Sequence, residues 1–423
     1  MKSQTGSESQ RTFWDRLTIC VFLTLLWLPT LDYFFKLDRA RATLENRRLA
    51  LWPHFDGIGR ARDFVAGMES YFNDHFGFRK RLIRWNSHWK DQLFHETSRR
   101  DALVGRDGWL FYSGSHMIED WTRQAAWDRQ EFENWRQLLE MRRDWLRARG
   151  IKYLFVVPPD KQTVYPEFLP EWLERSAQPS KIRQLAQYLK ARSTVEVLDL
   201  SKPLIDAKNV RVEYLKTDTH WNLFGGFVGC RALVAALAHQ LPALSPLPAT
   251  AYGWKQEEQP PGDLTIQLGG TELFRETTAV EPVPLEPLPA LKDLYDPVRL
   301  PQRDEKEHKP CYTFNEHASG KALLFRDSFA RAWYPFLGQH FREVIYIWHP
   351  EWDRPLIERE KPDVVIDEML ERIFNEQDPV ALARLDRMSE TNSPILRASS
   401  PARYPDSPRT ASSRTNNQNG SVR

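Results

Sequence analysis

One serine stands where the chain passes from an apolar run to a helix-like pattern, and its hydroxyl could act as a nucleophile. The run 322–325 is short and apolar, which is typical of a buried strand, and apolar residues from Ser328 onward recur at roughly helical spacing. Such a place suits a nucleophile because the free backbone N–H groups of a helix start can stabilise an oxyanion. Ser is also a favoured helix N-cap, and Asp327 could be that cap instead. The position therefore fits either catalysis or capping.

A candidate base for this serine lies upstream. Asp218 and His220 are two residues apart, so in an extended turn both side chains leave the same face. The carboxylate would then bind Nδ1 of the imidazole and leave Nε2 free to take a proton from Ser328. Two other interpretations remain: a satisfied core histidine, or a metal site with His116 or His349 as a further ligand. We expect a Ser-His-Asp triad and no bound metal.

The segments that must position these residues alternate between strand-like and helix-like patterns. The sequence predicts strands over 151–157, 195–200, 322–325, 344–348 and 364–366, and helices over 131–148, 181–191 and 224–241. This alternation is typical of an α/β domain with a mostly parallel sheet flanked by helices. Asp107-Gly108 is typical of a hairpin turn. Residues 242–320 are rich in Pro, so we expect loops and short strands there that frame a substrate groove.

The segments around the candidate triad carry a family resemblance. The stretches T-D-T-H-W-N at 217–222 and D-S-F at 327–329 resemble the SGNH-hydrolase-like domain of the alginate O-acetyltransferases of bacterial exopolysaccharide assembly. Further stretches match the same family in a consistent order within about residues 50–375, namely 73–79, 104–112, 156–166 and 362–368. The resemblance implies an SGNH fold in circularly permuted order. An ordinary SGNH hydrolase has its serine before its Asp/His turn, whereas here Asp218 and His220 come before Ser328. Arg326 stands where many SGNH proteins have Gly, which leaves the second oxyanion donor unassigned.

The resemblance implies O-acetylation of an alginate-like exopolysaccharide through an acetyl-serine intermediate. His220 would deprotonate Ser328, which would take the acetyl group as an ester, and His220 would then activate a sugar hydroxyl. The acetyl group would come from a membrane-bound O-acyltransferase partner, with no soluble cofactor. Lys161 and Tyr165, in a P-x-K-x-x-Y-P element, and Trp221 are the residues that we expect to bind the polymer. The alternative for these three is a solvated Lys and packed aromatic rings.

Two other functions fit the same residues. A carbohydrate acetylesterase would use the same triad and pass the acetyl group to water, since the two activities differ in how the site excludes water and holds the sugar. A non-catalytic polysaccharide-binding assembly protein would need the aromatic residues but not the serine.

The composition indicates a folded protein with balanced charge. With 41% hydrophobic and 12% aromatic residues the 423-residue chain can form a large core. Lys+Arg number 59 against 57 Asp+Glu, which gives no electrostatic argument for a nucleic-acid partner. Cys230 and Cys311 could pair in an oxidising compartment, but we expect them to be free, because Cys230 lies in a predicted helix and buried thiols are common.

The ends of the chain differ from the middle. We expect a cytoplasmic N-terminus over 1–16, a signal-anchor transmembrane helix over 17–36, a helical lead-in over 37–100, the SGNH-like domain over 101–385 and a disordered tail over 386–423. A cleaved signal peptide or a buried helix are alternatives for the apolar segment. Basic residues are more frequent after this segment than before it, which would keep the C-terminal side in the cytoplasm. The family resemblance instead implies a single-pass inner-membrane protein with its catalytic domain in the periplasm, and we adopt that prediction.

Overall fold

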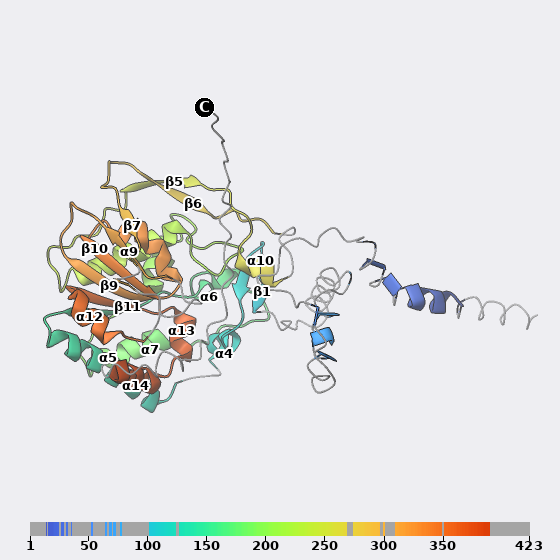
Figure 1. Cartoon of the computed structure of the whole chain (residues 1–423), viewed down its shortest axis with the longest axis horizontal. Coiled ribbons are helices and arrows are strands. Elements are labelled where there is room, and N and C mark those ends of the chain that lie inside the picture. Colours follow the sequence, from blue (N-terminus) through green and yellow to red (C-terminus); the bar gives the residue numbers. More distant parts are fainter. Residues whose placement is uncertain are drawn as a thin grey trace, which may run out of the picture. The chain divides into compact units, whose positions relative to one another are not determined.

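The computed structural model describes residues 101–389 apart from 124–126, 269–273, 297–298, 301–308 and 349–350, together with short stretches between residues 14 and 77 (Figure 1). The chain divides into two compact units, of which one holds Met1–Arg99, Ile266–Gly270 and Pro405–Arg423, and the other holds Arg100–Thr265 and Thr271–Tyr404.

In the first unit, apolar side chains at helical positions are exposed, among them Trp14, Ile19, Phe22 and Trp27. No helix within the described stretches is both long enough and apolar enough to cross a membrane. The predicted N-terminal segment 1–16 and the lead-in 37–100 fall largely outside the described residues, whereas most of the predicted anchor 17–36 is described and is helical over 17–24. The predicted tail 386–423 lies outside the described residues beyond residue 389, and 386–389 are helical rather than disordered.

A seven-stranded sheet forms the centre of the second unit. Its strand order is β4-β3-β11-β9-β10-β8-β7. The bounds are β3 (Lys152–Val157), β4 (Val197–Asp199), β7 (Lys292–Leu294), β8 (Cys311–Phe314), β9 (Lys321–Arg326), β10 (Glu343–Trp348) and β11 (Val364–Glu368). Neighbours from β4 to β10 pair in parallel, whereas β8 pairs antiparallel with both β10 and β7. The predicted mostly parallel sheet is confirmed.

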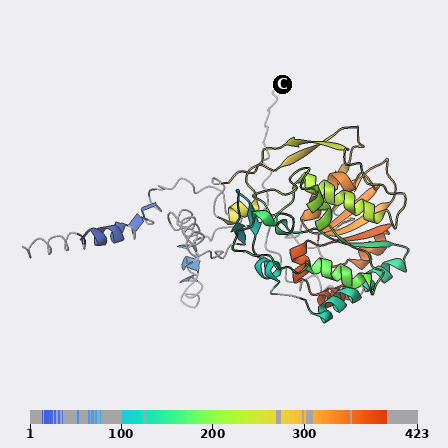
Figure 2. The ribbon, with the colours of Figure 1, turned by 180° about the vertical axis from the view of Figure 1, so that it is seen from behind.

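Helices cover both faces of this sheet, because its central strands are apolar on both sides. In β9, Leu324 belongs to a buried cluster with α9 (Leu223–Leu237) and α8 (Ser201–Ala207). Leu323 and Phe325, which point to the opposite face, pack with α5 (Arg129–Arg147), α7 (Lys181–Lys190), α12 (Arg354–Glu360) and α14 (Pro379–Ser389). The result is a three-layer α/β/α arrangement (Figures 1 and 2).

Helix α5 is fixed at its start and in its middle. Asp128 and Glu131 form a reciprocal capping box at its first turn. In its middle Arg142, which is fully buried, binds Asp386 of α14 at 2.7 Å and also Asp367 of β11. These ion pairs connect α5 and α14 to the sheet.

Smaller elements surround the sheet. Strands β1 (Ala102–Val104) and β2 (Leu110–Tyr112) form the predicted hairpin, with positive φ of 54° at Asp107 and 77° at Gly108. The insertion before β7 contains an antiparallel ribbon that stands at the top of Figures 1 and 2, made of β5 (Tyr252–Gln256) and β6 (Val280–Pro284). The short helices are α4 (Met117–Thr122), α6 (Lys161–Val164), η3 (Pro166–Phe168), α10 (Asp263–Gln267), η4 (Phe329–Trp333), α11 (Tyr334–Leu337) and α13 (Glu371–Glu376). Cys230 and Cys311 are not joined in a disulfide, as predicted.

Candidate active site

A tight turn presents the Asp-x-His pair just before α9. Tyr214 and Trp221 form an antiparallel bridge across the base of the turn, and the Leu215 N–H donates to the His220 carbonyl at 3.1 Å. Asn222 then caps α9 by accepting from the Gly225 N–H at 3.0 Å. The chain is therefore fixed on both sides of residues 217–219, which form the tip of the turn.

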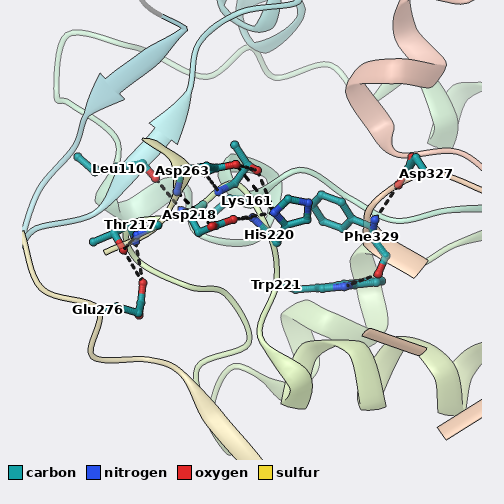
Figure 3. A network of polar contacts seen from close by, with 12 residues as sticks. Leu110, Lys161, Thr217, Asp218, His220, Trp221, Asp263, Glu276, Asp327 and Phe329 are labelled. Carbon is teal, nitrogen blue, oxygen red and sulfur yellow. Dashed lines mark hydrogen bonds and ion pairs between the residues drawn. The ribbon is translucent and has the colours of Figure 1, made fainter. Parts of the chain in front are cut away.

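Asp218 and His220 make the predicted contact. Oδ1 of Asp218 lies 2.6 Å from His220 Nδ1 and also accepts the His220 backbone N–H at 3.0 Å (Figure 3). Burial raises the pKa of Asp218, but the imidazole charge and these hydrogen bonds outweigh it and hold the pKa below its usual value. Burial likewise lowers the pKa of His220, yet Asp218 and a second carboxylate, Asp263, bring it above its usual value. The carboxylate thus fixes the imidazole orientation and stabilises its protonated form.

The other imidazole nitrogen is available for chemistry. Nε2 of His220 is buried and has no hydrogen-bond partner among the described residues. The ring packs against Phe329 with centroids 5.1 Å apart, and the Trp221 indole N–H donates to the Phe329 carbonyl at 2.9 Å (Figure 3). The structure therefore joins the Asp218–His220 turn to the residue that follows Ser328 in the chain.

The strand-to-helix turn at Ser328 differs from a simple capped helix. Ser328 is partly buried, precedes a 3-10 helix rather than the predicted α-helix, and makes no side-chain capping bond. Asp327 supplies that bond instead, because its Oδ1 accepts the Phe329 N–H at 2.8 Å. The capping alternative therefore belongs to Asp327, and the Ser328 hydroxyl is left for another role.

Two buried carboxylates from neighbouring strands hold the Ser328 turn. Glu368, at the end of β11, accepts the Asp327 N–H at 2.8 Å, and Asp327 Oδ2 accepts the Leu370 N–H at 2.7 Å. Burial, together with the Asp327 charge, raises the pKa of Glu368 well above its usual value. The N–H groups of Asp327 and Phe329 are thus bound to carboxylates and are not free to bind an oxyanion.

The three residues predicted to bind the polymer lie inside the protein. Lys161, Tyr165 and Trp221 are each 3% exposed. Nζ of Lys161 donates to the backbone carbonyls of Leu110, Lys216 and Asp218, and the Tyr165 hydroxyl donates to Glu213. The polar atoms of all three are thus used within the domain, and Lys161 binds the turn that carries Asp218 directly. Their contact with the polymer stays a prediction.

Asp263 is a site residue that the sequence analysis missed. Its backbone N–H donates to Asp218 Oδ2 at 3.2 Å, and its carboxylate accepts both the N–H and the hydroxyl of Thr219 at 2.8 Å each. The only signal in the sequence is a Pro-Pro-Gly-Asp run at 260–263 within the insertion, and nothing in such a run shows where it packs.

The same groups have the spacing of a cation site. Asp218, His220 and Asp263 each offer one ligand-type atom within 4.8 Å of the others. These atoms are used in hydrogen bonds to one another and to Thr219, which favours an acid–base pair over a metal centre. His116 contacts Glu376 instead, and His349 lies outside the described residues.

Comparison with known proteins identifies the class. The sequence model of the family described as "SGNH hydrolase-like domain, acetyltransferase AlgX" matches residues 102–350. The chain therefore belongs to this family of SGNH hydrolase-like domains, whose α/β fold agrees with the observed sheet and flanking helices.

Curated relatives carry the names of alginate O-acetylases. The chain is 27% identical over 266 residues to the probable alginate O-acetylase AlgJ of Pseudomonas syringae pv. tomato, a match that covers 63% of this chain and 60% of that protein. It is 31% identical over 150 residues to the probable alginate O-acetylase AlgJ of Pseudomonas putida, covering 35% and 37% of the two chains. The matched part thus spans about 60% or less of the length of these relatives.

Solved structures are similar at lower identity. The O-acetyltransferase domain of Pseudomonas putida AlgJ matches with a TM-score of 0.43 and 20% identity over 69% of this chain and 100% of that one. Bacillus cereus PatB1 matches with a TM-score of 0.48 and 17% identity over 66% and 98% of the two chains.

Proposed function

We propose that this protein O-acetylates a bacterial exopolysaccharide, alginate-like in its chemistry, through an acetyl-serine intermediate on Ser328. The observation that carries the proposal is the Asp218–His220 pair. Asp218 binds Nδ1 of His220, while Nε2 has no hydrogen-bond partner among the described residues, and the ring packs against Phe329, the residue after Ser328. The family membership and the names of the curated relatives support acetyl transfer as the reaction.

The reaction would proceed in two steps with His220 as the proton carrier. Nε2 takes the Ser328 hydroxyl proton while Oγ bonds to the acetyl carbon, and the imidazolium returns that proton to the leaving group of the donor. A sugar hydroxyl then loses its proton to Nε2 and attacks the ester, and Ser328 recovers its proton from the imidazolium. Asp218 stabilises the imidazolium in both steps, and the Ser328 N–H would bind the oxyanion.

The proposal includes the cellular setting of the enzyme. An apolar anchor over 17–36 would hold a periplasmic catalytic domain at the inner membrane, where a membrane-bound O-acyltransferase would supply the acetyl group. The support is the uncharged run 17–31 and the exposed apolar side chains of Ile19, Phe22 and Trp27. A topology reporter fused after Arg423 tests this arrangement, and a cytoplasmic signal from it would overturn the periplasmic location.

The order of the triad residues fits a permuted SGNH domain. Asp218 and His220 precede α9, whereas Ser328 follows β9 more than one hundred residues later. Triads are defined by geometry rather than chain order, so this order is compatible with the chemistry.

The test uses the full chain and an activated acetyl ester. Intact mass should show one added acetyl group on the wild type and none on Ser328→Ala, and added oligosaccharide should remove it from the wild type as acetylated sugar. Release of acetate at the same rate with and without acceptor would instead identify an esterase. If neither protein gains acetyl and no ester is consumed, the catalytic proposal is wrong and a polysaccharide-binding role takes its place.

A further inference from the structure

Asp263 comes from the insertion between α9 and β7, yet it makes contacts along most of the catalytic turn. Its N–H donates to Asp218 Oδ2 at 3.2 Å, and its two carboxylate oxygens each accept from Thr219 at 2.8 Å. The carboxylate therefore holds the residue between Asp218 and His220, while the backbone holds the oxygen of Asp218 that faces away from the imidazole (Figure 3). Both contacts help to hold the turn, together with the bond from Lys161 Nζ to the Asp218 carbonyl.

The preceding residue fits the same close approach. A Cβ on Gly262 would lie 2.3 Å from the Asp218 Cβ and 2.7 Å from its Cα, which no side chain tolerates. The Gly262 N–H also donates to Thr217 Oγ1 at 2.9 Å, and Thr217 in turn donates to Glu276. The insertion therefore contacts the turn at each of the consecutive residues Thr217, Asp218 and Thr219.

Asp263 also adds charge beside the base. Its Oδ2 lies 4.0 Å from His220 Nδ1, so the imidazole has a second carboxylate in addition to Asp218. Arg372 is the cation whose charge opposes proton binding by His220, and Lys161 and Glu276 add charge on the far side of the turn. A proton arriving at Nε2 thus creates an imidazolium whose Nδ1 side faces two carboxylates, which favours the proton transfer from the serine.

We propose that Asp263 is a second positioning carboxylate of this site: it locks the turn so that Asp218 stays on His220 Nδ1, and it stabilises the imidazolium that forms during acetyl transfer. This inference rests on the proposed function for its catalytic readout. It extends that function, because the anion comes from the insertion that was predicted only to frame a groove.

The charge and the hydrogen bonds can be separated by substitution. Asp263→Asn keeps one side-chain oxygen as an acceptor for the Thr219 N–H and removes the charge, while Asp263→Glu keeps the charge. Glu258→Gln is a matched control, since it removes an exposed charge from the same insertion.

The experiment measures the rate of Ser328 acylation by an activated acetyl ester against pH, on the full chain. In Asp263→Asn the acid-side inflection should move to lower pH by about one unit or more, because a unit charge 4.0 Å away shifts a pKa by roughly one unit even at the dielectric constant of water, and by more in a buried site. In Asp263→Glu, which keeps the charge, the inflection should lie closer to the wild-type pH than in Asp263→Asn. Glu258→Gln should leave the wild-type profile unchanged. An Asp263→Asn profile with a lower plateau but an unmoved inflection would show a purely structural residue and overturn the proposal.

A second measurement is independent of catalysis. The His220 ring resonance is titrated by NMR in Ser328→Ala and in the double variant Ser328→Ala/Asp263→Asn, with assignment by loss of the signal in His220→Gln. A lower midpoint in the double variant supports Asp263 even if the wild type is never acylated, in which case only the proposed function fails. Equal midpoints in the two proteins would refute the role of Asp263 whatever the enzyme does.

Discussion

Replacing Gly262 by alanine should inactivate the site without unfolding the domain. The new Cβ would start 2.3 Å from the Asp218 Cβ, and an ordinary contact begins near 3.4 Å, so the two segments must separate by about 1 Å. A shift of that size at Asp218 stretches its 2.6 Å contact with His220 Nδ1 beyond hydrogen-bond range. We expect the acylation rate to fall by about 10²-fold or more. The strain should also lower the free energy of unfolding by about 1–3 kcal/mol.

The assay is the first-order rate of Ser328 acylation, measured by rapid quench and intact mass, with urea unfolding of the same sample. Gly253→Ala in β5 is the control, because its new Cβ would approach the end of the Leu285 side chain at 3.3 Å, and that flexible chain end can yield. A Gly262→Ala protein that is folded and acylated within about threefold of the wild-type rate would refute the reasoning that the insertion packs directly on the catalytic turn.

Three further predictions concern charged groups. Asp218→Asn should lower the acylation rate by about 10³–10⁴-fold, because the imidazole loses its orienting anion, and a loss below tenfold in rapid-quench assays would contradict this role. Burial lowers the pKa of Lys161 to about 8 from 10.5, so the folded protein releases this proton before the unfolded chain does. The free energy of unfolding should therefore rise between pH 8 and 10.5 by up to about 3 kcal/mol in urea titrations, and the same rise in Lys161→Met would exclude Lys161 as its source. Arg142→Met leaves Asp367 and Asp386 buried without their cation and should cost about 3–5 kcal/mol in urea unfolding, whereas a loss under 1 kcal/mol would show that these carboxylates are not held as ions.

The sheet was predictable because each of its central strands has a recognisable local sequence pattern. The apolar runs that became β3, β9, β10 and β11 are short, uninterrupted and separated by helical patterns, so burial on both faces follows from the sequence. The contact between Asp218 and His220 was equally accessible, since it depends on a spacing of two residues and a turn.

The rest of the site was not predictable, because it depends on packing between distant segments. Lys161 and Tyr165 have the residue types of a sugar-binding element, and only the structure shows that their polar atoms are used inside the domain. Asp263 lies in a Pro-rich stretch without periodicity, so no local pattern places it beside His220. Ser328 was expected to start an α-helix, whereas a 3-10 helix follows it before α11 begins at Tyr334.

The position of β11 has a consequence for folding. This strand is the last of the sheet in the chain, yet it lies between β3 and β9 and pairs with both. Val364 of β11 pairs with Lys152 of β3, and the two residues are more than two hundred positions apart in the chain. The centre of the sheet therefore closes only when nearly the whole domain is available. A nascent or truncated chain that ends before Val364 would lack the Glu368 that holds the Ser328 turn, so this turn would remain unassembled until synthesis of the domain is complete.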